Sequence, residues 1–317
     1  MSVSEKESVY RAPGAPEDQN DDYRVIATAL DGKVRAVAIR STRVCEQAKD
    51  FFDLSPVSSV ALGRFMTGTL LLASNLKNDN ETLTAHIRCD GPINGMTVVC
   101  NANGQVKGYC NEPIVETTYY SPGKINVAAA IGQGMLTIIR DSGLKEPYIG
   151  SVELISGEIG EDFAYYLGAS EQTQSIVALG VLITSEGVKQ AGGFMIQLMP
   201  GADEQTVEYL EKRASGGFPD VTFLLEEGLN PEQILDMFLG DPDRVYLSAQ
   251  PVTYHCDCSR ERMERALIAL GKDELLALSR EKEPIELKCH FCGKAYSFMP
   301  QELARWLISP DINNNEK

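Results

Sequence analysis

Two pairs of cysteines near the carboxyl-terminal end constrain the fold of this chain more than any other feature. One residue separates Cys256 from Cys258, two residues separate Cys289 from Cys292, and 30 residues lie between the pairs. A structural zinc ion needs four soft ligands at the corners of a tetrahedron, and two close pairs of thiolates can supply them. Gly293, directly after the second pair, would let the chain turn back. We therefore expect these four cysteines to bind one zinc ion per chain.

The same cysteines also suit redox chemistry. A metal-bound cysteine is a thiolate, which is the form that oxidants attack. The ring closed by a Cys-x-Cys disulfide is small and strained, so such a bond would be easily reduced. Because a small zinc domain depends on its metal for folding, oxidation of the ligands would unfold it. With four cysteines available, His255 and His290 are expected to lie outside the ligand set. The residues alone indicate a metal site, a redox device or both.

The remaining four cysteines carry less information. Cys45 lies in a predicted helix, and Cys89, Cys100 and Cys110 lie in or beside predicted strands. We expect them to be buried as small apolar side chains. Residues 1–22 lack the apolar segment of a signal peptide, so we expect a cytoplasmic, reducing location.

The balance of charge argues against several classes of partner and activity. The chain has 45 acidic and 29 basic residues, a net charge of −16, which disfavours nucleic acid and anionic membrane surfaces as partners. Residues 57–74 are apolar but contain Arg64, so we expect a buried helix rather than a membrane span. The chain lacks a phosphate-binding loop motif, and Gly132-Gln133-Gly134 lacks the third glycine of a dinucleotide-binding motif. We therefore expect a protein that is not an enzyme.

The sequence predicts four successive regions. Residues 1–22 read as a disordered acidic tail, and residues 23–200 as an α+β core with two layers of mostly antiparallel strands and helices. Residues 201–244 read as an acidic helical linker, because 11 acidic and 2 basic residues lie between positions 203 and 243. Residues 245–317 form the small carboxyl-terminal zinc domain.

Local signals predict many individual elements. Two strands, residues 23–29 and 34–40, flank the turn at Asp31-Gly32, and Ser55-Pro56 begins a long helix. Asp203 begins another helix, and Asn230-Pro231 with Gln233 forms a capping box that begins the next. Short strands are expected at residues 285–288 and 295–298, on either side of Cys289-x-x-Cys292. A strand is also expected over residues 125–130, and a helix beginning at residue 170.

Several longer stretches carry a resemblance to a known family. They are LSPVSSVALGRFMTG (54–68), CDGPINGM (89–96), VKGYCNEP (106–113), SGEIGEDFAYYLGASEQ (156–172), GGFMIQLMPGA (192–202), HCDCSRER (255–262) and CHFCGK (289–294). Over about residues 23–307 the sequence resembles the heat shock protein 33 family, the redox-regulated chaperone holdases. The combination of Cys-x-Cys with Cys-x-x-Cys is the most specific part of the resemblance, and the tail at residues 1–22 is longer than is usual in that family.

The resemblance implies a mechanism for this chain. Zinc would bind Cys256, Cys258, Cys289 and Cys292 in the reduced, inactive protein. Under oxidative stress, Cys256–Cys258 and Cys289–Cys292 disulfides would form and the zinc would be released. The linker would then lose order, the chain would form homodimers, and the core would hold unfolding client proteins without ATP.

Two other functions remain open from the sequence. The first is a zinc-ribbon regulatory or nucleic-acid-binding module, which the charge of −16 disfavours. The second is a thiol–disulfide oxidoreductase, which typically carries its Cys-x-x-Cys at the start of a helix. Here Cys292 is followed by Gly293, Lys294 and a predicted strand.

Overall fold

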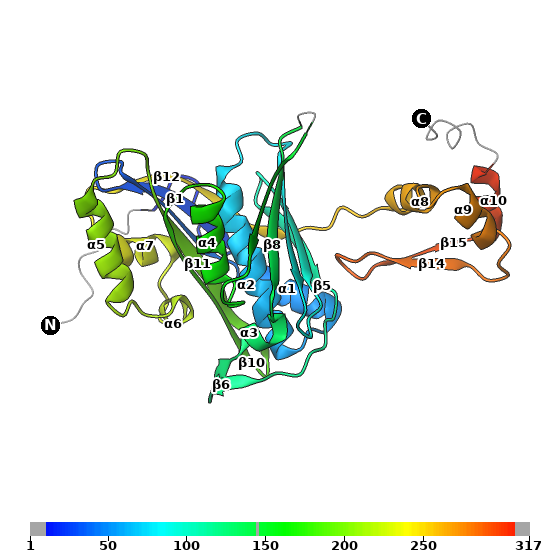
Figure 1. Cartoon of the computed structure of the whole chain (residues 1–317), viewed down its shortest axis with the longest axis horizontal. Helices are drawn as coiled ribbons and strands as arrows, with labels where there is room; N and C mark the ends of the chain where they lie inside the picture. Colours follow the sequence, from blue (N-terminus) through cyan, green and yellow to red (C-terminus); the bar gives the residue numbers. More distant parts are fainter. Residues whose placement is uncertain (1–10, 144–145, 308–317) are drawn as a thin grey trace. The chain divides into compact units, whose positions relative to one another are not determined.

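The computed structural model describes residues 11–143 and 146–307 of the chain and divides into two compact units. The core unit extends to His255, and the cysteine unit begins at Cys256. The predicted α+β architecture with antiparallel sheets is confirmed (Figure 1).

The first sheet of the core unit has five antiparallel strands in the order β10-β11-β2-β1-β12. Their bounds are β1 Tyr23–Ala29, β2 Val34–Arg40, β10 Ser175–Thr184, β11 Gly187–Leu198 and β12 Val245–Pro251. The hairpin of β1 and β2 has the predicted bounds. Its turn needs left-handed backbone, with φ of 51° at Leu30, 56° at Asp31 and 76° at Gly32.

The second sheet has six strands in the order β13-β5-β4-β3-β8-β9, antiparallel except for the pair β13 and β5. Their bounds are β3 Thr82–Cys89, β4 Met96–Asn101, β5 Gln105–Cys110, β8 Gly134–Asp141, β9 Tyr148–Glu153 and β13 Thr253–Tyr254. A separate small hairpin joins β6 (Tyr119–Ser121) to β7 (Lys124–Ile125).

Helix α2 (Pro56–Leu72) packs against strands of both sheets and forms the centre of the core unit (Figure 1). The Ser55 side chain accepts a hydrogen bond from the Ser58 N–H, which confirms the predicted start. A short 3₁₀ helix, η1 (Ala73–Asn75), continues it. The segment Pro56–Asn75 is long and apolar enough to cross a membrane, but 89% of its apolar 18-residue window is buried, as expected for a core helix. The remaining helices around it are α1 (Thr42–Phe52), α3 (Val127–Ile131) and α4 (Gly160–Ala169).

Three helices from the predicted linker cover the other face of the first sheet (Figure 1). They are α5 (Glu204–Ser215), α6 (Val221–Glu226) and α7 (Pro231–Leu239). The Asn230 and Gln233 side chains form the predicted capping box at the start of α7. Ile234, Leu235 and Phe238 of α7 are buried in one apolar cluster with the sheet residues. The linker is therefore an integral layer of the core unit.

The structure places two domain boundaries differently from the sequence prediction. Residues 245–255 do not belong to the cysteine unit, because β12 pairs with β1 and β13 pairs with β5. The division falls between His255 and Cys256. Of the predicted disordered tail, residues 11–22 lie against the core unit, where Ala12 is buried. Residues 1–10 lie outside the described part of the chain.

Two predicted elements are wrong. The strand expected over residues 125–130 ends at Ile125, because the Asn126 side chain accepts a hydrogen bond from the Ala129 N–H and begins α3. The helix expected from residue 170 does not form, since α4 ends at Ala169 and β10 begins at Ser175.

The cysteine unit combines three helices with one hairpin. Its elements are α8 (Arg260–Ile268), α9 (Lys272–Leu278), β14 (Ile285–Lys288), β15 (Ala295–Phe298) and α10 (Pro300–Trp306). The predicted strands have the expected bounds, and Ser259 caps α8 by accepting from the Arg262 N–H. The buried apolar cluster of this unit contains Leu267, Leu275, Tyr296, Phe298 and Leu303.

Candidate metal centre

The structure brings the four predicted ligands together. Cys256 and Cys258 lie in the segment that precedes α8, and Cys289 and Cys292 lie in the turn between β14 and β15. The four Sγ atoms all lie within 4.8 Å of one another. Packing of the cysteine unit therefore brings Cys256 and Cys289, which are 33 positions apart, into one site.

The hairpin turn shapes the second pair of ligands. The Cys289 N–H donates to the Lys294 carbonyl at 3.0 Å, and the Gly293 N–H donates to the Cys289 carbonyl at 2.9 Å. Gly293 has φ of 68°, a conformation that side chains other than glycine rarely adopt. The chain reverses at this glycine as predicted, so both thiols of the pair point to one centre.

The separations between the sulfur atoms suit a tetrahedral zinc ion. Zinc–sulfur bonds of about 2.3 Å in a tetrahedron require sulfur atoms about 3.8 Å apart. The Sγ atoms of Cys256 and Cys289 are 3.6 Å apart, and those of Cys258 and Cys292 are 3.4 Å apart. The donor set and its geometry therefore fit zinc.

Hydrogen bonds favour negative charge on one of the four sulfurs. Burial opposes ionisation of Cys258, but hydrogen bonds from Tyr296 and from the other three thiols together lower its pKa. The Tyr296 hydroxyl lies 3.2 Å from the Cys258 Sγ and 3.0 Å from the Cys258 carbonyl oxygen. Burial raises the pKa of Cys256 and of Cys292. The arrangement therefore helps to keep Cys258 in the thiolate form that binds metal and reacts with oxidants.

Tyr296 was not identified from the sequence, although it is the hydrogen-bond partner of a ligand. Its position four residues after Cys292, in the returning strand of the hairpin, is the signal that could have found it. His255 and His290 are exposed, and within the described residues the ligand cluster consists of the four cysteines.

The other cysteines lie apart from this cluster in the core unit. Cys45, Cys100 and Cys110 are buried as expected, and Cys89 is half-buried. Burial raises the pKa of Cys45 and of Cys100 to about 12, so both are neutral thiols at physiological pH. They behave as small apolar side chains.

Comparison with known proteins identifies the family. Residues 22–299 match the family model described as Hsp33 protein. The chain belongs to the Hsp33 family. A 33 kDa chaperonin of Acetivibrio thermocellus is 45% identical over 286 residues, which cover 90% of this chain and 96% of the relative. A 33 kDa chaperonin of Ruminiclostridium cellulolyticum is 45% identical over 282 residues, covering 89% and 96% of the two chains.

A solved structure supports the same assignment. The crystal structure of the Hsp33 homologue of Thermotoga maritima has a TM-score of 0.84 with this chain and 36% sequence identity. The likeness covers 91% of this chain and 98% of that one. Hsp33 proteins are molecular chaperones, which is not an enzyme class, and the chain is assigned to the chaperones on this basis.

Proposed function

We propose that this Hsp33 protein is a redox-regulated holdase, which binds unfolding proteins without ATP after its four clustered cysteines are oxidised. One observation carries the proposal. The four thiols lie together in a unit whose apolar core is very small. Such a unit depends on its ligands for folding, so ligand chemistry can control it.

In the reduced protein, Cys256, Cys258, Cys289 and Cys292 would hold one zinc ion. Through such an ion, these residues would join the segment before α8 to the β14–β15 hairpin, and the metal would keep the thiols ionised. The tetrahedral separations of the four sulfurs support this assignment.

Oxidation would convert the four ligands into two disulfides, Cys256–Cys258 and Cys289–Cys292. Each disulfide forms as two electrons pass to an oxidant of the peroxide class and the two sulfurs lose their charge. The folded cluster also brings Cys256 close to Cys289 and Cys258 close to Cys292. We favour the neighbouring pairs because the unit unfolds as its ligands are lost, and short loops then close most readily.

The apolar face of the first sheet is the surface that activation would expose. Sheet residues on this face include Val25, Ala36, Phe194 and Ile196, and α5, α6 and α7 cover them in the resting structure. Only β12, β13 and short connections lie between α7 and Cys256. The pairing of β13 with β5 involves two residues. Unfolding of the cysteine unit would free these short strands and then the linker helices.

The exposed face would bind apolar segments of unfolding client proteins and would allow two oxidised chains to form a dimer. The net charge of −16 would keep the loaded chaperone soluble in the cytoplasm and would not favour nucleic acid or a membrane. A thiol–disulfide oxidoreductase is disfavoured, since Cys289-x-x-Cys292 lies in a hairpin turn and not at the start of a helix.

The test measures light scattering by a heat-unfolding enzyme in the presence of this protein. The zinc-loaded reduced protein should not suppress aggregation, and the peroxide-treated protein should do so without ATP. Zinc release and thiol content are measured on the same samples. A Cys256→Ser/Cys258→Ser variant should lose the dependence on peroxide, whereas Cys89→Ser should behave as the parent. Equal protection by reduced and oxidised protein would refute redox control, and protection by neither would refute the holdase.

A further inference from the structure

The chain before β1 forms an ordered strap across the core unit. This N-terminal strap, residues 11–16, is closed by hydrogen bonds from the Ala15 N–H to the Ala12 carbonyl at 3.0 Å and from the Arg11 guanidinium to the Pro16 carbonyl at 2.6 Å. Ala12 is 3% exposed and belongs to the same apolar cluster as the residues of α7. The strap is therefore part of the layer that covers the first sheet.

The strap is attached to the edge strand β12. The Ala249 N–H donates to the Pro13 carbonyl at 2.6 Å. Gly14 has φ of 85°, and a Cβ atom placed there would lie 2.8 Å from the Ala249 carbonyl oxygen. A glycine is required at this position both by the backbone conformation and by the close approach of β12.

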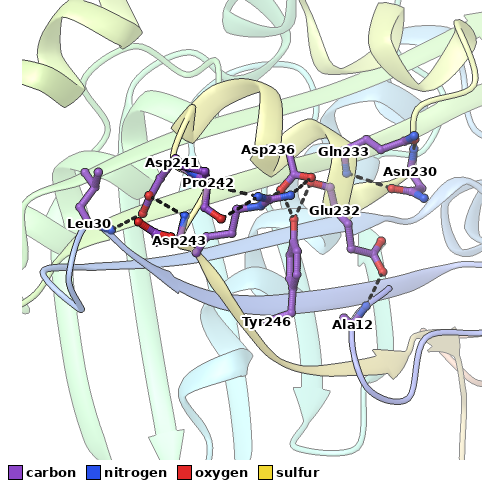
Figure 2. A network of polar contacts seen from close by, with 11 residues as sticks. Ala12, Leu30, Asn230, Glu232, Gln233, Asp236, Asp241, Pro242, Asp243 and Tyr246 are labelled. Atoms are coloured by element: carbon purple, nitrogen blue, oxygen red, sulfur yellow. Dashed lines mark hydrogen bonds and ion pairs between the residues drawn. The ribbon is translucent and has the colours of Figure 1, made fainter. Parts of the chain in front are cut away.

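The strap also reaches the linker helix α7 through a buried carboxylate. Glu232, in the first turn of α7, is 0% exposed. Its Oε1 accepts from the Ala12 N–H at 3.2 Å (Figure 2). The same oxygen lies 3.6 Å from the Arg11 Nε, and the Oε2 accepts from the Tyr23 hydroxyl at 2.7 Å. Within the described part of the chain, Arg11 is the ion-pair partner of Glu232. A buried carboxylate that loses its counter-charge and a hydrogen bond is strongly disfavoured, so the strap and the docked helix stabilise each other.

Besides its contacts with β1, α5 and the apolar face of the sheet, α7 makes polar contacts with the segment after it. The Tyr246 hydroxyl lies 2.8 Å from the Glu232 carbonyl oxygen and also within hydrogen-bonding distance of an Asp236 carboxylate oxygen (Figure 2). Asp236 also pairs with Arg244. Tyr246 and Arg244 lie in the segment between α7 and the cysteine unit, so their contacts with α7 would be lost when that segment is released. The strap comes from the opposite end of the chain. Its hydrogen bond from Ala249 would be lost with β12, but the contacts of Arg11 and Ala12 with Glu232 would remain at that moment.

The strap lies outside the region shared with the family. The Hsp33 model matches residues 22–299, and the alignment with the Acetivibrio thermocellus relative covers 96% of that protein but 90% of this one. The strap therefore precedes the segment that the family model matches.

We propose that the N-terminal strap is an autoinhibitory latch that holds α7 on the sheet and delays its release after oxidation of the cysteines. The inference rests on the proposed function in one respect, which is that activation releases the linker. Because coupling between two sites is reciprocal, release of α7 should also weaken the docking of the strap.

The test compares the full-length chain with variants that remove the latch. Gly14→Val introduces the contact with Ala249, and Arg11→Met removes the charge beside Glu232. Gly123→Val is the matched control, because Gly123 has φ of 82° and a Cβ atom placed there would meet no other atom within 4 Å. It adds similar backbone strain without a clash. Arg11→Lys, which restores a positive charge, should recover part of the parent behaviour.

Two measurements separate the latch from the proposed function. In reduced, zinc-loaded protein, amide hydrogen exchange of α7 should be at least about fivefold faster in Gly14→Val and Arg11→Met than in the parent, with α2 unchanged. After peroxide treatment, these variants should reach half-maximal suppression of aggregation sooner, while zinc is released at the parent rate. Exchange of the Ala12 amide should accelerate when the parent is oxidised.

Equal α7 exchange in the parent, Gly14→Val and Arg11→Met would overturn the latch, whatever the aggregation assay shows. Faster α7 exchange with an unchanged activation time would overturn its role in activation. Faster α7 exchange in the variants, together with no protection by any oxidised protein, would support the latch as a structural contact and refute the holdase.

Discussion

The core unit buries two extensive apolar clusters on either side of its first sheet, whereas the described part of the cysteine unit has one apolar cluster of five buried residues. In the core unit, α2 and the linker helices provide partners for both faces of that sheet. In the cysteine unit, four thiols take the place of a larger apolar core. Apolar burial is insensitive to oxidants, but thiolate ligands are not. Under the proposed function, this difference would allow one part of the chain to respond to oxidation while the centre of the other remains folded.

Loss of one cysteine ligand should give the largest difference in stability between the two units. Zinc binding contributes on the order of 10 kcal/mol or more to the folding of small zinc domains, so Cys289→Ser should abolish stable zinc binding and loosen the cysteine unit. The part of the core unit around α2 should stay folded. Zinc analysis and hydrogen exchange of α8, α10 and α2 measure both effects. Cys89→Ser, a half-buried thiol of the core unit, is the control. Melting of α2 in Cys289→Ser would show that the two units are not independent.

Loss of a buried apolar side chain of the linker should instead destabilise the core unit and leave zinc binding by the cysteine unit unchanged. Phe238 is buried on α7, with ring centroids 4.9 Å from Phe194 and 5.1 Å from Phe218. Phe238→Ala should destabilise the core unit by about 3–5 kcal/mol, the usual cost of such a cavity, and leave zinc affinity unchanged. Phe223→Ala is the matched control, because Phe223 of α6 is 53% exposed. Urea unfolding measures the change, and altered zinc affinity in Phe238→Ala would contradict the separation of roles.

The smallest effect concerns a buried carboxyl group in the core unit. Burial raises the pKa of Asp22 to about 6, although its Oδ2 accepts from the Val44 N–H at 2.8 Å. The folded state therefore favours the protonated carboxyl. The stability that it contributes is complete below its unfolded pKa and is lost as the pH rises through about 6.

Asp22→Asn removes this titration. Relative to the parent, the variant should gain about 1.4 kcal/mol of stability between pH 5 and pH 7.5, out of about 3 kcal/mol in total. Urea unfolding of the core unit at several pH values measures the difference. Asp50→Asn, on the exposed surface of α1, should show none. If the stability of Asp22→Asn relative to the parent fell as the pH rises, Asp22 would be stabilised as the anion.

Elements with local signals were predicted well from the sequence. The turn at Asp31-Gly32, the capping box of Asn230 and Gln233, and the hairpin around Cys289-x-x-Cys292 all formed as expected. Each depends on residues within a few positions of one another. The prediction of a strand over residues 125–130 was wrong. A short apolar segment of this kind suits a helix equally well, and the Asn126 side chain provides the cap that begins one.

The placement of the linker could not be predicted in this way. The acidic composition of the linker reflects the exposed faces of α5 to α7. The burial of Phe238 depends instead on Phe194 and on other residues of the first sheet. Likewise, β12 belongs to the core unit because β1, more than 200 residues earlier, offers it an edge. Pairing between such distant strands leaves no local pattern.

The sequence by itself determined the chemistry of the candidate metal centre, because ligand type and close spacing are properties of the residues themselves. It also determined the order of the α+β core, the linker and the cysteine unit along the chain. Only the tertiary structure decided that Tyr296 supports Cys258 and that the linker covers an apolar sheet. It alone placed Ala12 against Glu232, 220 residues away. Burial depends on which distant segments meet, and that is settled only when the whole chain folds.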